Sequence, residues 1–256
     1  MNILHALVLG AVEGLTEFLP ISSTAHLIIV SKLLGLADAD FTKSFEIIIQ
    51  LGAIAAVVSV YWKRFLTDWV TLKKLVVAFI PTGIVGFVLY PLIKGYFLGN
   101  LWLALAMLGL GGIFLMVFEY WYGKKIHARR VRTEMTYPAA FIIGCSQAVS
   151  VVPGVSRAAA TIVGGLSLGF SREMIVEFSF LLAVPTMAAA TGYDFLKNVH
   201  AFSLHDAGIL GVGLIASFIV ARIAITAFLR YIRRNTFVGF GIYRIVVAIL
   251  GFIFIR

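Results

Sequence analysis

Two carboxylates one helical turn apart begin the part of the sequence that could do chemistry. Glu13 and Glu17 lie in the otherwise apolar stretch 3–19, and their spacing places both on one face of a helix. A charged group at the centre of a bilayer costs about 2.5–3.5 kcal/mol on insertion scales, so such residues normally face a cavity. Paired carboxylates suit a hard divalent cation or general acid–base chemistry. The alternative is a shallow helix whose carboxylates sit in interfacial water.

Pro20 interrupts this stretch, and hydroxyl groups and an imidazole follow it. Ser22, Ser23 and Thr24 are consecutive, and His26 comes two residues later. With the nearby glutamates, these side chains could supply a nucleophile, a proton carrier and hydrogen-bond donors. One of the two serines could instead be the N-cap of a short helix that begins near Thr24, and the N-terminus of that helix would itself attract an anion.

A second polar break follows the apolar stretch 139–152. It contains Pro153, Gly154, Ser156 and Arg157. Glycine lets the backbone approach a ligand closely, and a guanidinium is a planar fork that matches a phosphate. The alternative role of Arg157 is an ion pair with one of the two glutamates that serves folding only.

The amino-acid composition indicates the environment of these polar groups. Of the 256 residues, 61% are hydrophobic and 13% are charged, and the mean hydropathy is +1.01. Soluble domains have about 45–50% apolar and about 25% charged residues, so the excess apolar surface of this chain must face lipid. The net charge of +9 comes from basic residues in a few short loops, as the positive-inside rule requires, so we expect no nucleic-acid partner.

Hydropathy predicts an all-α polytopic membrane protein with six spanning helices. The two broken stretches are too short or too polar to cross, so we interpret both as re-entrant helix–loop–helix hairpins. The basic residues of loops 63–74, 124–132 and 230–234 then lie on one side, which is the cytoplasmic side, and both termini face outward. The predicted spans are 44–62, 75–93, 101–122, 174–196, 207–228 and 237–255.

This topology makes the two halves of one integral membrane domain inverted repeats, about 1–122 and 137–256. Residues 9–14 align with 143–148, and the same offset places Ser22 over Ser156 and Ser23 over Arg157. The first half keeps carboxylates, hydroxyls and an imidazole, and the second supplies a cation. Neither half alone makes a phosphoryl-transfer site, but the two together do.

Both motifs resemble a known family. The sequences EGLTEFLPISSTAH at 13–26 and PGVSR at 153–157 strongly resemble the two signature motifs of the bacterial undecaprenyl-diphosphatases of the bacitracin-resistance type. The likeness extends over the whole chain, including Ser44, Phe45 and Glu46. This chain has Ala25 where the family usually has glycine, and alanines at 158 and 159 where it has serine and glycine, so one hydroxyl that could contact phosphate is missing at 158.

The resemblance implies hydrolysis of undecaprenyl diphosphate to the monophosphate and inorganic phosphate, which recycles the lipid carrier of peptidoglycan synthesis and confers bacitracin resistance. It places the protein in the bacterial plasma membrane, with a site open to the outer, periplasmic face. It also implies a divalent cation, Mg²⁺ or Ca²⁺, bridging Glu13 and Glu17 to the diphosphate. The partners would be the lipid substrate and bilayer lipids, and a homodimer is left open.

Carried over to this sequence, the resemblance gives two sets of site residues. The working residues would be Glu13, Glu17, Ser23, His26 and Arg157. The substrate contacts, besides Arg157, would be Ser22, Thr24, Gly154, Ser156 and Thr161. In this scheme Ser23 or a water attacks the terminal phosphorus and His26 handles the proton; the sequence leaves Ser23, His26 and water open as nucleophiles.

Two other functions compete with a phosphatase. Inverted repeats and broken helices are typical of transporters, so a lipid flippase or secondary transporter is the main alternative. A structural channel subunit would leave the cluster of hydroxyls and histidine unexplained. Glu46 and Gln50, one turn apart, could approach the first hairpin and support the site. Four other charged residues in apolar segments could face a cavity or pair across helices; they are Glu177, Asp194, Arg222 and Arg244.

Overall fold

The computed structural model describes residues 1–36, 40–97, 99–125, 131–198 and 206–255. Within these ranges the regular secondary structure is helical, apart from an isolated bridge between Arg132 and Phe170. A helix satisfies its backbone hydrogen bonds within its own segment, which is what a segment in lipid requires. The prediction of an all-α multi-pass membrane protein is confirmed.

Five apolar stretches of the described residues are long enough to cross a bilayer, and they overlap five of the six predicted spans. The second lies earlier than predicted, at Trp69–Val88 rather than 75–93. In the first, α3 (Asp40–Ile48) and α4 (Gln50–Thr67) follow each other almost without a break. The other four are α5 (Trp69–Val88), α7 (Leu101–Lys125), α10 (Arg172–Asn198) and α11 (Asp206–Ile232).

The sixth predicted span corresponds to α12 (Val238–Phe254), which has only 17 residues. At about 1.5 Å per residue it is about 25 Å long, a few ångströms short of the roughly 30 Å apolar core of a bilayer. The apolar segment therefore exists where it was predicted, but it is shorter than the other five.

The predicted basic loop 63–74 is almost entirely helical. Helix α4 continues to Thr67, and α5 begins at Trp69. Asp68 alone separates them, and its side chain caps α5 by accepting a hydrogen bond of 3.0 Å from the Thr71 N–H. The basic side chains of this region therefore lie on helix ends rather than on a loop. After α5 come the short α6 (Tyr90–Leu92) and a π-helical turn, Ile93–Phe97.

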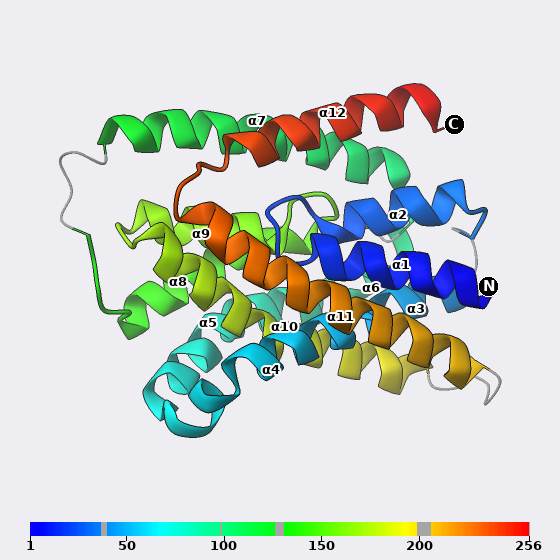
Figure 1. Cartoon of the computed structure of the whole chain (residues 1–256), viewed down its shortest axis with the longest axis horizontal. Helices are drawn as coiled ribbons and strands as arrows, with labels where there is room; N and C mark the ends of the chain where they lie inside the picture. The colour runs from blue at the N-terminus through cyan, green and yellow to red at the C-terminus, as the bar shows by residue number, and fades with distance from the viewer. Residues whose placement is uncertain (37–39, 98, 126–130, 199–205, 256) are drawn as a thin grey trace.

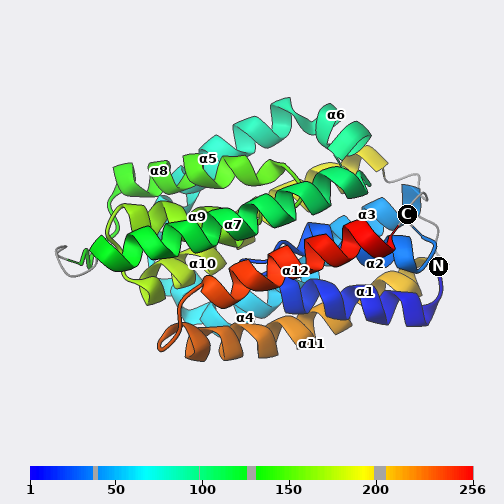
Figure 2. The same ribbon diagram turned by 90° about the horizontal axis from the view of Figure 1, so that it is seen from above.

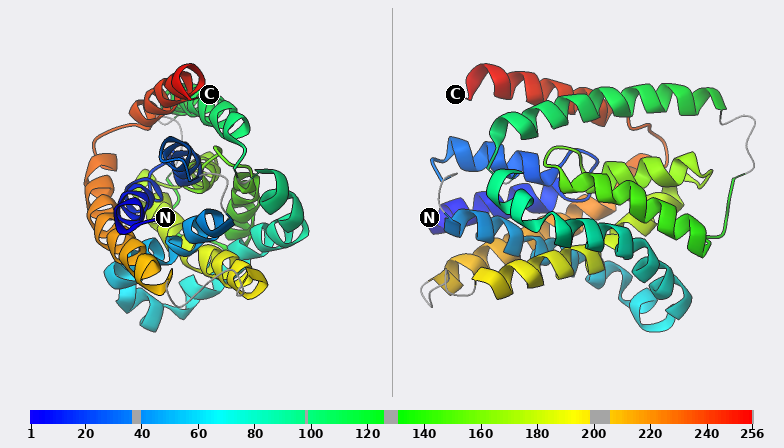
Figure 3. Two further views of the ribbon diagram at one scale, coloured as in Figure 1. Left: turned by 90° about the vertical axis from the view of Figure 1, so that its right-hand side faces the viewer. Right: turned by 180° about the vertical axis from the view of Figure 1, so that it is seen from behind.

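Both broken stretches form helical hairpins. In the first, α1 (Ile3–Thr16) is followed by α2 (Ser23–Leu33). In the second, α8 (Tyr137–Ala148) and a 3₁₀ turn (Val149–Val151) are followed by α9 (Arg157–Ser167). Figure 1 and the right-hand view of Figure 3 show the hairpins running inward from opposite ends of the molecule, so that their loops meet near its centre.

The ends of the molecule differ in which connections they carry. Both termini lie at one end, where α10 ends and α11 begins (Figure 1). The opposite end carries the junction of α4 and α5 and the connection from α11 to α12. Helices α7 and α12 run side by side over the hairpin loops, as Figures 1 and 2 show from two directions.

Glycines hold the first hairpin tightly against α11. A Cβ atom on Gly10 would lie 2.4 Å from the carbonyl oxygen of Gly213, and one on Gly14 would lie 2.4 Å from that of Ser217. Such close backbone contact between helices, made possible by small residues, is typical of packing in membranes. It fixes the face of α1 that carries Glu13 and Glu17 relative to the rest of the protein.

Candidate active site

The two hairpin loops end in the same unusual conformation. Ser22 and Ser156 have φ values of +67° and +76°, and they are the non-glycine residues with positive φ among those described. Each is the N-cap of the following helix, with its Oγ accepting from the backbone N–H of Ala25 or Ala159. Serine rarely adopts positive φ, so both loops hold a strained turn at the equivalent place. Because Ser22 is the cap, the hydroxyl of Ser23 is left for another partner.

That partner is Glu17, whose carboxylate connects the two hairpins. Ser23 Oγ donates a 2.5 Å hydrogen bond to Glu17 Oε2. On the other oxygen, Oε1 accepts from Nε and Nη2 of Arg157, at 3.3 and 3.2 Å. The side chains of this ion pair are only 10% and 4% exposed. The acidic half predicted from the first motif and the cationic half predicted from the second therefore meet.

Arg157 retains hydrogen-bonding capacity beyond this ion pair. Its Nη1 donates a 2.7 Å bond to the carbonyl oxygen of Ser179 on α10. A guanidinium has five N–H groups, and three have now been assigned. One N–H on each Nη atom has no partner within the described part of the chain. These two groups remain as donors for an additional acceptor such as a phosphate oxygen.

Glu13 lies one turn before Glu17 and is completely buried. Neither of its carboxylate oxygens has a hydrogen-bond partner among the described residues. Burying an unpaired carboxylate is costly, so the arrangement fits a ligand that supplies the missing contact. The described residues contain no group of three or more His, Cys, Asp or Glu side chains placed to hold a metal ion. Mg²⁺ often uses only one or two carboxylates and takes its other ligands from phosphate and water, so Glu17, with Glu13 one turn behind it, could still hold such a cation.

His26 does not contact Ser23 in this structure. Its Nδ1 lies 2.7 Å from the carbonyl oxygen of Ser22, and its Nε2 lies 2.9 Å from the hydroxyl of Tyr243. The carbonyl can only accept, so Nδ1 carries the proton and Nε2 accepts from the tyrosine. The two rings are also stacked, with centroids 5.6 Å apart. The hydroxyl of Ser23 donates to Glu17, and the imidazole holds the hairpin loop.

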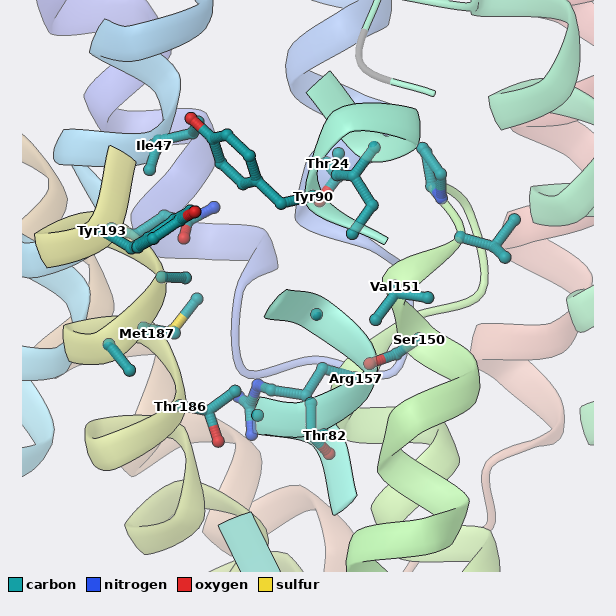
Figure 4. A pocket seen from close by; sticks show the side chains of 18 of the residues that line it. Thr24, Ile47, Thr82, Tyr90, Ser150, Val151, Arg157, Thr186, Met187 and Tyr193 are labelled. Atoms are coloured by element: carbon teal, nitrogen blue, oxygen red, sulfur yellow. The ribbon is translucent and has the colours of Figure 1, made fainter. Parts of the chain in front are cut away.

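A cavity of about 710 Å³ opens over the two loops. Glu17, Ser23, Thr24 and Arg157 give it a polar lining at the hairpins. Further polar side chains line it from other helices; they include Gln50, Thr82, Thr186 and Asp194. Its walls are mostly apolar and come from α5 and α10, with Phe79, Ile80, Ile84, Phe87, Val88 and Met187 as the largest apolar side chains. Figure 4 shows Arg157 beside Thr82, Thr186 and Ser150, with Tyr90 and Tyr193 at the far part of the cavity.

The predicted site residues do not all reach this cavity. Ser22, Gly154 and Ser156 line it, whereas Glu13, His26 and Thr161 do not. The fully buried Thr161 shares a 2.6 Å hydrogen bond with the hydroxyl of Ser179, so it joins α9 to α10 rather than facing a substrate.

Gly154 does make a close backbone approach, but mainly to α7. A Cβ atom there would lie 2.4 Å from the carbonyl oxygen of Ala104. Of the two supporting candidates, Gln50 lines the cavity, and Glu46 is held outside it by a 2.5 Å hydrogen bond from Ser31.

Sequence reasoning missed three residues that hold the site. Ser179 and Tyr243 are bound to Arg157 and His26. Arg244 was one of several charges inside apolar segments, but only the structure shows that it contacts both hairpin loops. The adjacency of Tyr243 and Arg244 in an apolar segment was the available signal, and it did not reveal their partners.

The chain is similar to known proteins over nearly its whole length. Residues 6–250 match the family of the bacitracin resistance protein BacA. The chain belongs to this family. It is 49% identical to a protein of Persephonella marina named undecaprenyl-diphosphatase, over 100% of this chain and 98% of the relative. Proteins of the same name from Wolinella succinogenes and Aquifex aeolicus are 50% and 47% identical; the alignments cover 98% and 96% of this chain and 97% and 96% of those proteins.

Proposed function

We propose that this BacA-family protein is an integral membrane phosphatase that converts undecaprenyl diphosphate into undecaprenyl phosphate and inorganic phosphate. The observation that carries the proposal is the Glu17 carboxylate, bound to the Ser23 hydroxyl of one hairpin and to the Arg157 guanidinium of the other. Relatives that match nearly the whole chain are named for this activity. The reaction would recycle the lipid carrier of peptidoglycan synthesis and thereby confer resistance to bacitracin.

The cavity suits a lipid diphosphate because its two parts differ in polarity. The diphosphate would lie over the loops, near the two unassigned N–H groups of Arg157 and the backbone N–H groups at the start of α2 and α9. The isoprenoid tail would lie along the apolar walls that α5 and α10 provide. Several of these wall residues, including Ile84, Phe87 and Val88, are 60–66% exposed, so they have apolar surface free to contact the tail or lipid.

The proposed reaction begins with Ser23. Its Oγ attacks the terminal phosphorus while Glu17 accepts the hydroxyl proton along the existing hydrogen bond. The bond between that phosphorus and the bridging oxygen breaks, and undecaprenyl phosphate leaves. A water molecule then hydrolyses the phosphoserine and releases inorganic phosphate. Arg157 stabilises the charge on the transferred group throughout.

His26 would act on the loop rather than on the phosphate. Its Nδ1–H donates to the Ser22 carbonyl, and the Tyr243 hydroxyl holds its other nitrogen. Together they fix the turn that presents Ser23. A divalent cation, Mg²⁺ or Ca²⁺, would be held by Glu13 and Glu17 together with phosphate oxygens. Such a cation would supply positive charge next to the diphosphate.

The topology we propose has six spanning helices and two re-entrant hairpins, arranged as inverted repeats, in the bacterial plasma membrane. Helices α2 and α9 support the repeat, since each has 11 residues and starts after an equivalent serine cap. The cavity is lined by the C-terminal halves of α5 and α10, which run toward the end that carries both termini. With the basic helix ends facing the cytoplasm, the cavity would open to the outer face.

Phosphate release in detergent tests this function. The purified protein is incubated with undecaprenyl diphosphate and Mg²⁺, and inorganic phosphate and the lipid product are both measured. We expect one phosphate for each undecaprenyl phosphate formed. A flippase or transporter needs two sides of a membrane and would release none, so an inactive but folded protein would refute the proposal.

A further inference from the structure

Among the described residues, Arg244 of α12 is the largest completely buried side chain, and every acceptor of its hydrogen bonds is a backbone carbonyl. Its five N–H groups match five such oxygens, at distances between 2.7 and 3.3 Å. The acceptors are Pro20 in the first hairpin loop, Gly154 and Val155 in the second, and Met107 and Leu108 on α7.

A buried guanidinium is not an efficient way to stabilise a fold. Burying a charge is costly even when its hydrogen bonds are complete, and apolar side chains of similar size are often at least as stabilising. A guanidinium that is saturated by carbonyl groups of three separate segments does, however, fix their relative positions. The pattern therefore indicates that Arg244 positions these three segments relative to one another.

Helix α7 contains a space that only glycine can leave for this guanidinium. A Cβ atom on Gly111 would lie 1.9 Å from Nη2 of Arg244 and 2.7 Å from its Cζ. No side-chain carbon can be accommodated at that distance unless the guanidinium moves. The position of the Arg244 guanidinium therefore depends on Gly111, although the two residues lie on different helices.

The carbonyl groups that Arg244 binds lie close to the reacting groups along the chain. Pro20 lies midway between Glu17 and Ser23, and Gly154 precedes Arg157 by one turn's length of chain. The neighbouring Tyr243 holds His26 from the same helix. One face of α12 thus contacts both hairpin loops on the side away from the cavity.

We propose that Arg244 is a positioning residue that sets the separation of the two hairpin loops, and with it the placement of Arg157 against Ser23 and Glu17. Gly111 leaves the space on α7 that the Arg244 guanidinium needs for this role. The catalytic consequence rests on the proposed phosphatase function, but the control of loop geometry does not.

Two variants disturb the contact between Arg244 and Gly111, one on α12 and the other on α7. In Arg244→Lys, an ammonium with three N–H groups replaces five, so at least two carbonyls lose their partner. In Gly111→Ala, the new methyl group displaces the guanidinium while Arg244 stays present. Because misplacing reacting groups by about 1 Å can cost about 100-fold in rate, we expect kcat to fall by about 10- to 100-fold in both, with KM within about twofold.

Two further glycines supply matched controls. In Gly109→Ala, the added carbon meets only Ala248 Cβ, at 3.3 Å, so activity should stay near that of the unchanged protein. In Gly251→Ala, the three atoms nearest to the added carbon all belong to the side chain of Leu105 on α7, with Cδ2 at 2.4 Å, so the change disturbs the packing of α7 on α12 away from the guanidinium. If Gly251→Ala lowers kcat as much as Gly111→Ala does, the effect is one of general packing and the proposal is wrong.

A double-mutant cycle and hydrogen exchange separate positioning from loss of folded protein. If Arg244 acts through Arg157, the Arg244→Lys change should cost much less in an Arg157→Lys background, whereas additive losses would contradict the proposal. Amide exchange at 21–23 and 154–156 should accelerate in Arg244→Lys and Gly111→Ala, and not in Gly109→Ala.

The exchange measurement needs no turnover. A wild-type protein that is inactive on undecaprenyl diphosphate would refute the proposed function and leave the exchange result to decide the role of Arg244. Unchanged exchange in both loops of Arg244→Lys and Gly111→Ala would overturn it.

Discussion

Glu17 accepts hydrogen bonds from both hairpins at once, through Oε2 from Ser23 and through Oε1 from Arg157. The sequence predicted these residues as site candidates because a carboxylate or guanidinium in an apolar stretch is unusual. It did not predict their hydrogen-bond partners. His26 binds Tyr243 across 217 residues, and Thr161 turned out to face Ser179, since such contacts depend on how helices pack and leave no local pattern.

The nucleophile can be tested at Ser23. Because its hydroxyl is the one bound to Glu17, we expect Ser23→Ala to lower kcat by at least about 100-fold without changing the melting temperature. Ser150→Ala is the matched control, since Ser150 also lines the cavity but donates to the Gln147 carbonyl. Normal turnover by Ser23→Ala would show that water or another group attacks the phosphorus.

Glu13 gives a test of the cation. The Glu13→Gln change keeps the shape of the side chain but removes its charge, so the affinity for a divalent cation should fall. We expect the Mg²⁺ concentration for half-maximal phosphate release to rise by at least about tenfold, with activity partly restored at high Mg²⁺. An unchanged Mg²⁺ dependence would exclude Glu13 from the cation site.

At the scale of elements, local signals identified both hairpins and five of the spans. Prolines and polar residues mark the breaks, and uninterrupted apolar runs mark the spans. The prediction of a loop at 63–74 was wrong because a polar segment need not be irregular. This basic segment is helical, since lysine and arginine are good helix formers outside the lipid as well. The sequence did offer Ser22 as one of two possible N-caps of the helix that follows, and the structure confirms it. The positive φ values of Ser22 and Ser156 were not predicted, because serine rarely adopts them and no local pattern signals them.

The loop of the second hairpin should tolerate no side chain at Gly154. This residue has φ of +93°, and a Cβ there would lie 2.4 Å from the Ala104 carbonyl. We expect Gly154→Ala to lower both the melting temperature and kcat. Gly35→Ala is the control, because Gly35 also has positive φ but no atom within 4 Å; strain alone should cost about 1–2 kcal/mol there. Equal effects of the two changes would mean that the close contact with α7 is unimportant.

At the scale of the whole molecule, the two hairpins run inward from opposite ends (Figure 1). Their loops bring complementary groups together, and α5 and α10 provide much of the wall of the cavity. Hydropathy could predict where chain enters lipid, but not which helices would border a cavity. That depends on which faces pack closely, as α1 does on α11 through Gly10 and Gly14.

The cavity walls can be tested at Gly86 of α5. This residue lines the cavity and has no atom within 4 Å of an added Cβ, so a larger side chain can enter the space proposed for the tail. We expect Gly86→Leu to lower kcat/KM for undecaprenyl diphosphate by about tenfold and to affect farnesyl diphosphate less. Gly123→Leu, at an equally open position on α7, should change neither. Equal losses for both substrates would place the tail elsewhere.

The most direct test of the central claim is the rate of phosphate release from undecaprenyl diphosphate by Arg157→Ala, normalised to folded protein. Arg222→Ala is the matched control, because Arg222 also lies within a span but is exposed and bonded to Ser59. If Arg157 of the second hairpin completes the site of the first, its loss should lower kcat per folded protein by at least about 100-fold, with Arg222→Ala close to wild type. The melting temperature of Arg157→Ala should also fall, because the buried Glu17 carboxylate loses its ion-pair partner. A folded Arg157→Ala protein that releases phosphate at the wild-type rate would contradict the account.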